Sequence, residues 1–198
     1  MPFDRQYFLS EQDLHRIHAA SMEILRRGGL LFHHDRAVQL FKSNGFKTDG
    51  NKVFIAEEDV VKALESAPER FCLEGRNPSR SQWIGGDDFV FVPTYGPPFV
   101  VEADGRQRPG VMADYELALK LNHTSDVAGV TGFKYLAPAD LRAADAYLDM
   151  LMASVTMSDK PFMGSTDDEQ AARDTMDILK LIYGENISDR RLAVGLIN

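Results

Sequence analysis

The sequence predicts an α/β fold in which a parallel sheet with helical crossovers follows a mostly helical N-terminal region. Four short apolar runs, typical of buried strands, recur about one strand–helix unit apart, near Val90, Val127, Phe162 and Val194. Segments with helical periodicity separate these runs, and such crossovers join parallel strands. The first eighty or so residues instead alternate short helices with short strands. We therefore predict a cap region over residues 1–86 and a sheet region over residues 87–198.

The cap region is predicted to begin with a helix that has Ser10 as its N-cap and ends at Gly28 and Gly29. Two further helices are expected over residues 35–44 and 57–67, because Gly45 and Pro68 follow them. Asp49 and Gly50 predict a turn. Short strands are expected at residues 30–32, 53–55 and 70–74.

The sheet region is predicted to open with a buried strand over residues 89–92, which stops at Pro93 because proline cannot donate to a sheet ladder. A rigid turn, Thr94-Tyr95-Gly96-Pro97-Pro98, follows it. The later expected elements are an extended piece at 99–102, a helix over 113–122, a strand over 127–131, a helix from Pro138 to residue 157, a strand over 161–164, a helix from a capping box at 166–169 to Tyr183, and a strand over 192–197.

A parallel sheet of this kind either stays open as a doubly wound sheet or closes into a (β/α)8 barrel. A barrel needs roughly 250 residues and eight strands, and residues 88–198 would supply about half of that. The last strand has no closing helix, which would leave a buried edge unpaired. The sequence is therefore expected to be the N-terminal part of a longer protein. Strand order separates the two folds, since a half barrel keeps sequential order and a doubly wound sheet reverses direction.

Composition narrows the class of partner. The chain has 198 residues, of which 44% are hydrophobic and 26% charged, as in an ordinary globular protein. A net charge of −8 argues against nucleic acid or an anionic membrane as the partner. The single cysteine, Cys72, excludes an internal disulfide and a cysteine metal cluster. The sequence has no secretory signal and no apolar run long enough to cross a bilayer, so a cytoplasmic location is expected.

Four stretches carry a resemblance to a known family: LSEQDLHRIHAASMEILRRGG, VFIAEEDVVKALESAPERFCLEGRNP, TYGPPFVVEADGRQRPGV and KPFMGST. In this order they resemble the trimethylamine methyltransferase family, over nearly the whole chain. The resemblance implies a partial (β/α)8 TIM-type barrel, with about the first four βα units present here. It also implies an enzyme of one-carbon metabolism, including methanogenesis. Such an enzyme moves a methyl group from trimethylamine, or from a quaternary amine such as glycine betaine, to the cobalt of a partner corrinoid protein.

The same resemblance implies that this chain binds no cofactor directly, because the cobalamin is carried by the partner corrinoid protein. One branch of the family uses pyrrolysine, at a position in the second half of the barrel. The present chain stops before that position, so the branch and the catalytic residues are left open.

Active sites of barrel enzymes lie at the carboxyl ends of the strands. The candidate substrate-binding residues are accordingly Thr94, Tyr95 and Gly96 after the first strand, Thr131 and Phe133 after the second, Met163 and Ser165 after the third, and Asn198 after the fourth. Tyr95 and Phe133 have two interpretations. They form walls of an aromatic cage for a methylated cation, or they pack in the core at the rim. Lys134 would repel such a cation and is assigned to solvent in preference to a substrate carboxylate.

Other polar groups are interpreted structurally. His15 and His18 are spaced i, i+3 on a helix, but no carboxylate or cysteine stands at a suitable spacing, so a solvated face is favoured over a metal site.

An alternative function is a non-catalytic doubly wound domain that binds a small molecule, and a third is a piece that is inactive without a complementary chain. The isolated chain is expected to expose apolar surface where the missing strands would pair, and so to associate with itself.

Overall fold

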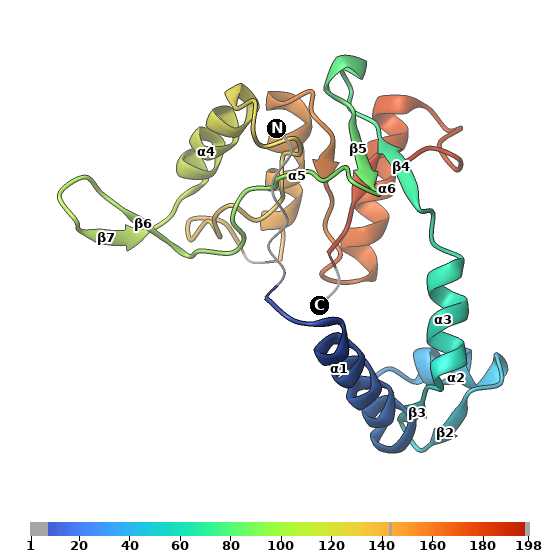
Figure 1. Cartoon of the computed structure of the whole chain (residues 1–198). Coiled ribbons are helices and arrows are strands. Elements are labelled where there is room, and N and C mark those ends of the chain that lie inside the picture. The colour runs from blue at the N-terminus through green and yellow to red at the C-terminus, as the bar shows by residue number, and fades with distance from the viewer. Residues whose placement is uncertain (1–7, 143, 197–198) are drawn as a thin grey trace. The chain divides into compact units, whose positions relative to one another are not determined.

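The computed structural model describes residues 8–142 and 144–196 and divides the chain into two compact units, Met1–Pro68 and Glu69–Asn198 (Figure 1). The segment between residues 69 and 86, which the sequence analysis assigned to the cap, belongs to the second compact unit. The division of a cap (1–86) from a barrel (87–198) stays a prediction.

The first unit opens with the expected helix, α1, over Glu11–Glu23. Ser10 caps it as predicted, because the Ser10 hydroxyl accepts the backbone N–H of Asp13 at 3.2 Å and the Asp13 carboxylate accepts that of Ser10 at 3.3 Å. The last turn, Ile24–Gly28, widens into a π-helix. Gly29 then ends the helix with φ = 72°, a conformation that favours glycine.

A small antiparallel sheet and two helices complete this unit. Strands β1 (Leu30–Leu31), β2 (Lys47–Asp49) and β3 (Lys52–Phe54) lie in the order β1-β3-β2, with helix α2 over Asp35–Ser43 and helix α3 over Glu57–Glu65. Val38 and Val53 are buried. The ring of Phe41 contacts that of Phe32 in a tilted arrangement and that of Phe46 edge-on. Strand β2 was not predicted, although the turn at residues 49–50 that joins it to β3 was.

Two antiparallel hairpins lie in the second unit. Strand β4 (Arg70–Leu73) pairs with β5 (Gln82–Gly85) across a short 3₁₀ turn (η2, Pro78–Arg80), and β6 (Phe99–Val101) pairs with β7 (Gln107–Pro109). The sequence predicted β4 and β6 but neither partner strand. Strand β7 contains polar residues and a proline, so it has no apolar alternation that would mark it as a strand.

Three helices and one parallel strand pair form the rest of the second unit: α4 (Met112–Thr124), α5 (Ala146–Met157), α6 (Glu169–Tyr183), β8 (Phe162–Met163) and β9 (Ala193–Val194). Pro138 does not begin a helix, so that expectation was wrong. The backbone N–H groups of Ala137 and Ala139 donate to the carbonyls of Pro97 and Gly110, which draws this segment into a loop, and α5 begins only at Ala146. Helix α6 is capped by Asp168, whose carboxylate accepts the N–H of Ala171 at 2.8 Å, and not by Thr166 as the predicted capping box required.

The expected strands at residues 89–92 and 127–131 do not form regular strands. Phe91 makes one parallel bridge, to Ala128. Phe89 and Phe91 are 58% and 50% exposed, so the prediction of a buried strand here was wrong for this chain. With one bridge between them, the two segments lack the run of ladder bonds that defines a strand.

Two parallel pairs, Phe91 with Ala128 and β8 with β9, are nevertheless joined in sequence order by backbone hydrogen bonds. The N–H of Gly129 donates to the carbonyl of Phe91 at 3.0 Å, and that of Thr131 donates to Pro161 at 2.9 Å. Strand β8 then pairs with β9 in parallel, where Gly164 donates to Val194 at 2.8 Å. These segments, near residues 91, 128–131, 161–164 and 193–195, are called the parallel row below.

The core of the second unit lies between the parallel row and its helices. Its buried side chains include Tyr115, Leu119, Phe133, Leu151, Phe162 and Leu179. The helices of the described ranges are too short or too polar to cross a bilayer.

Candidate functional site

The candidate site is the carboxyl-end rim of the parallel row, where four loops follow four neighbouring segments. The first is the turn at residues 94–98. Gly96 has φ = 86° and donates its N–H to the carbonyl of Lys134 at 2.6 Å, while Ala137 donates to Pro97 at 3.1 Å. These two bonds attach the first loop to the second. Thr94 and Tyr95 are not buried, and 48% of Tyr95 is accessible to solvent.

The second loop begins with three buried residues. Thr131 is fully buried, and its hydroxyl donates to the carbonyl of Gly132 at 2.9 Å. Gly132 has φ = 71°, and a Cβ there would lie 3.2 Å from Pro93. The ring of Phe133 is 1% exposed, and its carbonyl accepts a hydrogen bond from the hydroxyl of Tyr115 at 2.7 Å. Phe133 thus packs in the core, which is the second of the two interpretations given above.

The third loop follows β8 and is held by α6. Met163 and Ser165 are buried. The N–H of Ser165 donates to the hydroxyl of Thr175 at 3.1 Å, and Thr175 donates in turn to the carbonyl of Ala171 at 2.9 Å. Gly164 leaves no room for a side chain, because a Cβ would lie 2.3 Å from the Cγ2 of Thr175.

The fourth loop follows β9. The hydroxyl of Thr166 donates to the carbonyl of Leu196 at 2.6 Å, which ties the third loop to the fourth. Asn198, the candidate at the end of this segment, lies outside the described residues.

An ion pair crosses the rim. The ammonium of Lys134 lies 2.6 and 2.7 Å from the two carboxylate oxygens of Asp167. The sequence analysis assigned Lys134 to solvent; in the structure its side chain is 29% exposed and pairs with Asp167. Asp167 was not among the candidate residues. The sequence did contain a signal for it, since both residues follow parallel segments that were expected to be neighbours.

A recess of about 340 Å³ lies beside this ion pair. Lys134, Asp167, Asp168 and Tyr147 line it together with Met150 and Pro138. The Tyr147 hydroxyl donates to the carboxylate of Asp174, and this hydrogen bond raises the pKa of Tyr147 to about 12. The recess therefore combines carboxylates, a neutral phenol and apolar surface.

One buried hydroxyl near the rim has no protein partner among the described residues. It belongs to Tyr135, whose side chain is 7% exposed and packs edge-on against Tyr115. Burial raises the pKa of Tyr135 far above its ordinary value, so the hydroxyl is neutral at physiological pH.

The structure thus brings together the loops that carry seven of the eight candidate residues, through backbone bonds and the Lys134–Asp167 pair. It does not pair Tyr95 with Phe133, because Tyr95 is exposed and Phe133 is buried in the core. Whether these residues contact a substrate stays a prediction. Within residues 8–142 and 144–196, no three His, Cys, Asp or Glu side chains are placed to hold a metal ion.

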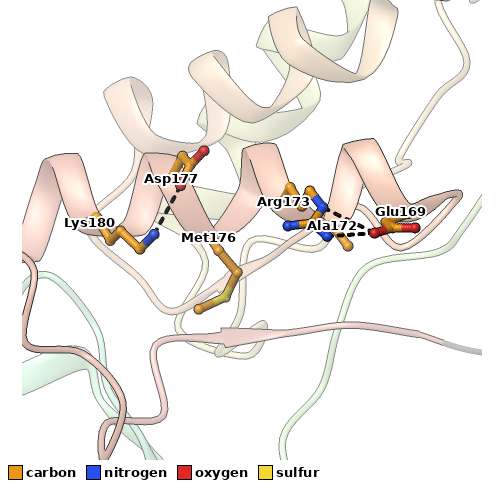
Figure 2. A pocket seen from close by; sticks show the side chains of 6 residues that line it. All are labelled: Glu169, Ala172, Arg173, Met176, Asp177 and Lys180. Carbon is orange, nitrogen blue, oxygen red and sulfur yellow. Dashed lines mark hydrogen bonds and ion pairs between the residues drawn. The ribbon is translucent and has the colours of Figure 1, made fainter.

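A larger recess, of about 520 Å³, lies along one side of α6 and is separate from the rim. Figure 2 shows Met176 projecting between two ion pairs, Glu169–Arg173 and Asp177–Lys180, all on that helix. These charges already pair with each other, and Ala172 and Met176 supply the apolar part of the lining.

The sequence was also compared with known protein families and curated proteins. Residues 2–198 match the family model described as trimethylamine methyltransferase (MTTB). The chain belongs to the trimethylamine methyltransferase family.

Among curated relatives, the glycine betaine methyltransferase of Desulfitobacterium hafniense (strain Y51) is 36% identical over 192 residues, which cover 96% of this chain and 40% of the relative. The L-carnitine:corrinoid methyltransferase of Eubacterium limosum is 29% identical over 89% of this chain and 38% of the relative. The trimethylamine methyltransferase of Methanosarcina thermophila is 41% identical over a shorter stretch, 34% of this chain and 14% of the relative. The chain thus spans about 40% of the length of the first of these relatives.

Proposed function

We propose that the polypeptide carrying this chain is a methyltransferase that moves a methyl group from a quaternary amine to the cobalt of a partner corrinoid protein. The observation that carries the proposal is the family match over residues 2–198, together with relatives named for glycine betaine and carnitine over most of the chain. The match to the trimethylamine enzyme covers a third of the chain, which supports a quaternary amine over trimethylamine.

We further propose that residues 87–198 supply the first four strand–helix units of a (β/α)8 barrel. Supporting this, the parallel row follows sequence order from Phe91 through Ala128 and Pro161 to Val194. A doubly wound sheet would reverse this order at a switch point. In a barrel, the rim described above would form part of the active-site face.

For this methyl transfer, the protein mainly has to bind the quaternary amine and orient its methyl group. When the methyl group leaves a quaternary nitrogen, the C–N bond breaks, both of its electrons stay on nitrogen, and the product is a neutral tertiary amine that needs no proton. The methyl group forms its new bond to the reduced cobalt of the partner. A quaternary ammonium has no N–H to donate, so it is bound by aromatic faces, apolar surface and carboxylates. The recess beside Lys134 and Asp167 offers the aromatic ring of Tyr147, the apolar Met150 and the carboxylate of Asp168. The carboxylate of Asp167 is already paired with Lys134, whose ammonium would repel the cation but attract a substrate carboxylate.

The test is a methyl-transfer assay of the polypeptide that carries this chain, with a reduced corrinoid protein as acceptor. Glycine betaine, carnitine, trimethylamine and tetramethylammonium are compared as donors, and the methylated cobalt is followed by its absorbance. Transfer from one of the carboxylate-bearing quaternary amines, at a rate well above that from trimethylamine, is expected. Transfer from trimethylamine alone would overturn the quaternary-amine assignment, and transfer from none of the donors would overturn the methyltransferase itself.

A further inference from the structure

The strongest unexplained feature of the second unit is a buried lysine at the end of the parallel row opposite the rim. Lys160 is 7% exposed, and its ammonium donates to three backbone carbonyls, those of Asn122 at 2.6 Å, Ser125 at 2.6 Å and Ala128 at 2.7 Å. An ammonium has three N–H donors, so all three are used. None of these protons is free to bind a ligand. The ammonium of Lys160 therefore serves to hold backbone segments of this chain together.

The three acceptors belong to two elements that the lysine joins. Asn122 lies in the last turn of α4 and Ser125 follows the end of this helix, where free carbonyls and the helix dipole favour a cation. Ala128 is the residue that bridges to Phe91 in the parallel row. The lysine thus connects the end of α4 with the start of the second segment of the row.

A second bond fixes the same segment three residues further along the chain. Thr131 donates its N–H to the carbonyl of Pro161, which directly follows Lys160. Residues 128–131 are therefore clamped to residues 160–161 at both ends. Beyond the clamp come Gly132 and Phe133, at the rim.

Charged groups surround the ammonium. Arg80 and His123 lie nearby with Asp159 between them, at 3.3 Å and 3.7 Å from its Oδ1, and Asp126 is a further carboxylate in this region. Burial lowers the pKa of Lys160, and Arg80 lowers it further, while Asp126 and Asp159 oppose this effect. The three charge-assisted hydrogen bonds favour the protonated form.

We propose that Lys160 is a positioning residue for the rim: its ammonium sets the place of residues 128–131 and so of the rim loop that follows Thr131 at the candidate substrate site. The effect of Lys160 on substrate binding rests on the proposed function. The effect of Lys160 on the position of residues 128–131 does not, and the two effects are tested separately.

The first test follows amide hydrogen exchange in the chain with Lys160→Met, which keeps a long apolar stem but removes the charge and the donors. Exchange at the amides of Gly129 and Thr131 should rise by about tenfold or more relative to the amides of α6, because the segment opens locally. The matched control, Lys180→Met, removes a surface lysine that pairs with Asp177 and should leave both amides unchanged. An equal rise at all amides of the unit would show a general structural role and overturn the proposal, as would no rise.

The second test needs no variant and so does not depend on folding of the substituted chain. The Lys160 side chain is titrated by NMR in the unsubstituted protein. Its midpoint should lie below the ordinary value for lysine, and the amide signals of Gly129 and Thr131 should titrate with the same midpoint. Amide signals of Gly129 and Thr131 that do not shift with the titration of Lys160 would contradict the proposal.

The third test uses activity. If the methyltransferase proposal holds, Lys160→Met should raise KM for the methylated amine more than it lowers kcat, and Lys160→Arg should restore part of the loss. If amide exchange changes but KM does not, Lys160 positions residues 128–131 without affecting substrate binding. That result would reject the substrate claim but would contradict neither the methyltransferase proposal nor the effect of Lys160 on residues 128–131.

Discussion

Lys134 and Asp167, which are 33 residues apart, form an ion pair with an N–O distance of 2.6 Å across two loops of the rim. The two side chains are 29% and 49% exposed, so solvent weakens the attraction. The pair therefore orients the two loops more than it stabilises the fold.

The first prediction concerns this pair. A double-mutant cycle with Lys134→Met and Asp167→Asn should give a coupling free energy of roughly 0.5 kcal/mol, since partly exposed pairs contribute little. The measurement is urea unfolding of the four proteins at low and high salt, and the coupling should shrink as salt rises. A coupling of several kcal/mol that is insensitive to salt would contradict the assignment to a solvent-screened pair.

The second prediction concerns the contact between β8 and α6. Gly164→Ala should lower the free energy of unfolding by about 1–3 kcal/mol, because its Cβ would overlap the Cγ2 methyl of Thr175. Adding Thr175→Ser removes this methyl and keeps the hydroxyl that accepts from Ser165, so the double variant should recover most of the loss. Chemical unfolding measures both.

The control for that experiment is Gly28→Ala, at a site where the atom nearest to an added Cβ would be 3.9 Å away. It should change stability far less than Gly164→Ala. If Thr175→Ser does not restore the free energy of unfolding, the backbone at residue 164, and not the Thr175 methyl, causes the loss of stability.

The third prediction concerns the start of α4 and its dependence on pH. Asp114 accepts two hydrogen bonds from Arg108, at 2.6 and 2.7 Å, and one from the N–H of Val111, and the Arg108 bonds lower its pKa to about 2. Because this pKa is lower in the folded than in the unfolded chain, the stabilisation is complete above the ordinary carboxyl pKa of 3.8 and is lost as pH falls towards 2.

Asp114→Asn should therefore be less stable than the unsubstituted chain near neutral pH, and the difference should shrink between about pH 5 and pH 2. The measurement is thermal unfolding over this range. A difference that stays constant down to pH 2 would show that the ionised carboxylate is not the stabilising group.

The fourth prediction concerns exposed apolar surface in the second unit. Leu181 is 86% exposed, Met176 46% and Leu196 43%, so the isolated 198-residue chain should associate with itself. Sedimentation velocity should show species larger than a monomer at micromolar concentration, and Leu181→Glu should reduce them with little effect on the unfolding midpoint. A monomer at every concentration would contradict this.

The sequence predicted the elements that carry their own local signals. Ser10 with Asp13 marks the start of α1, and the parallel neighbours near Phe162 and Val194 were expected from apolar runs. Strand β7 was missed because its residues are polar, although the hairpin-like turn at residues 103–105 that joins it to β6 was expected. The helix expected at Pro138 failed because distant carbonyls take the backbone donors there, and no local pattern records such partners. For the rim, the pairing of Lys134 with Asp167 depends on tertiary distance, which spacing along the chain does not record.

The close approach of Gly164 to Thr175 has a consequence for how sequences of this kind can diverge. While threonine occupies position 175, a larger residue at 164 lowers stability, and serine at 175 would remove the nearest of the contacts that cause this. Substitutions at the two positions should therefore arise as a correlated pair, with the helix position changing first, and ancestral reconstructions that reverse this order should pass through a poorly folding intermediate.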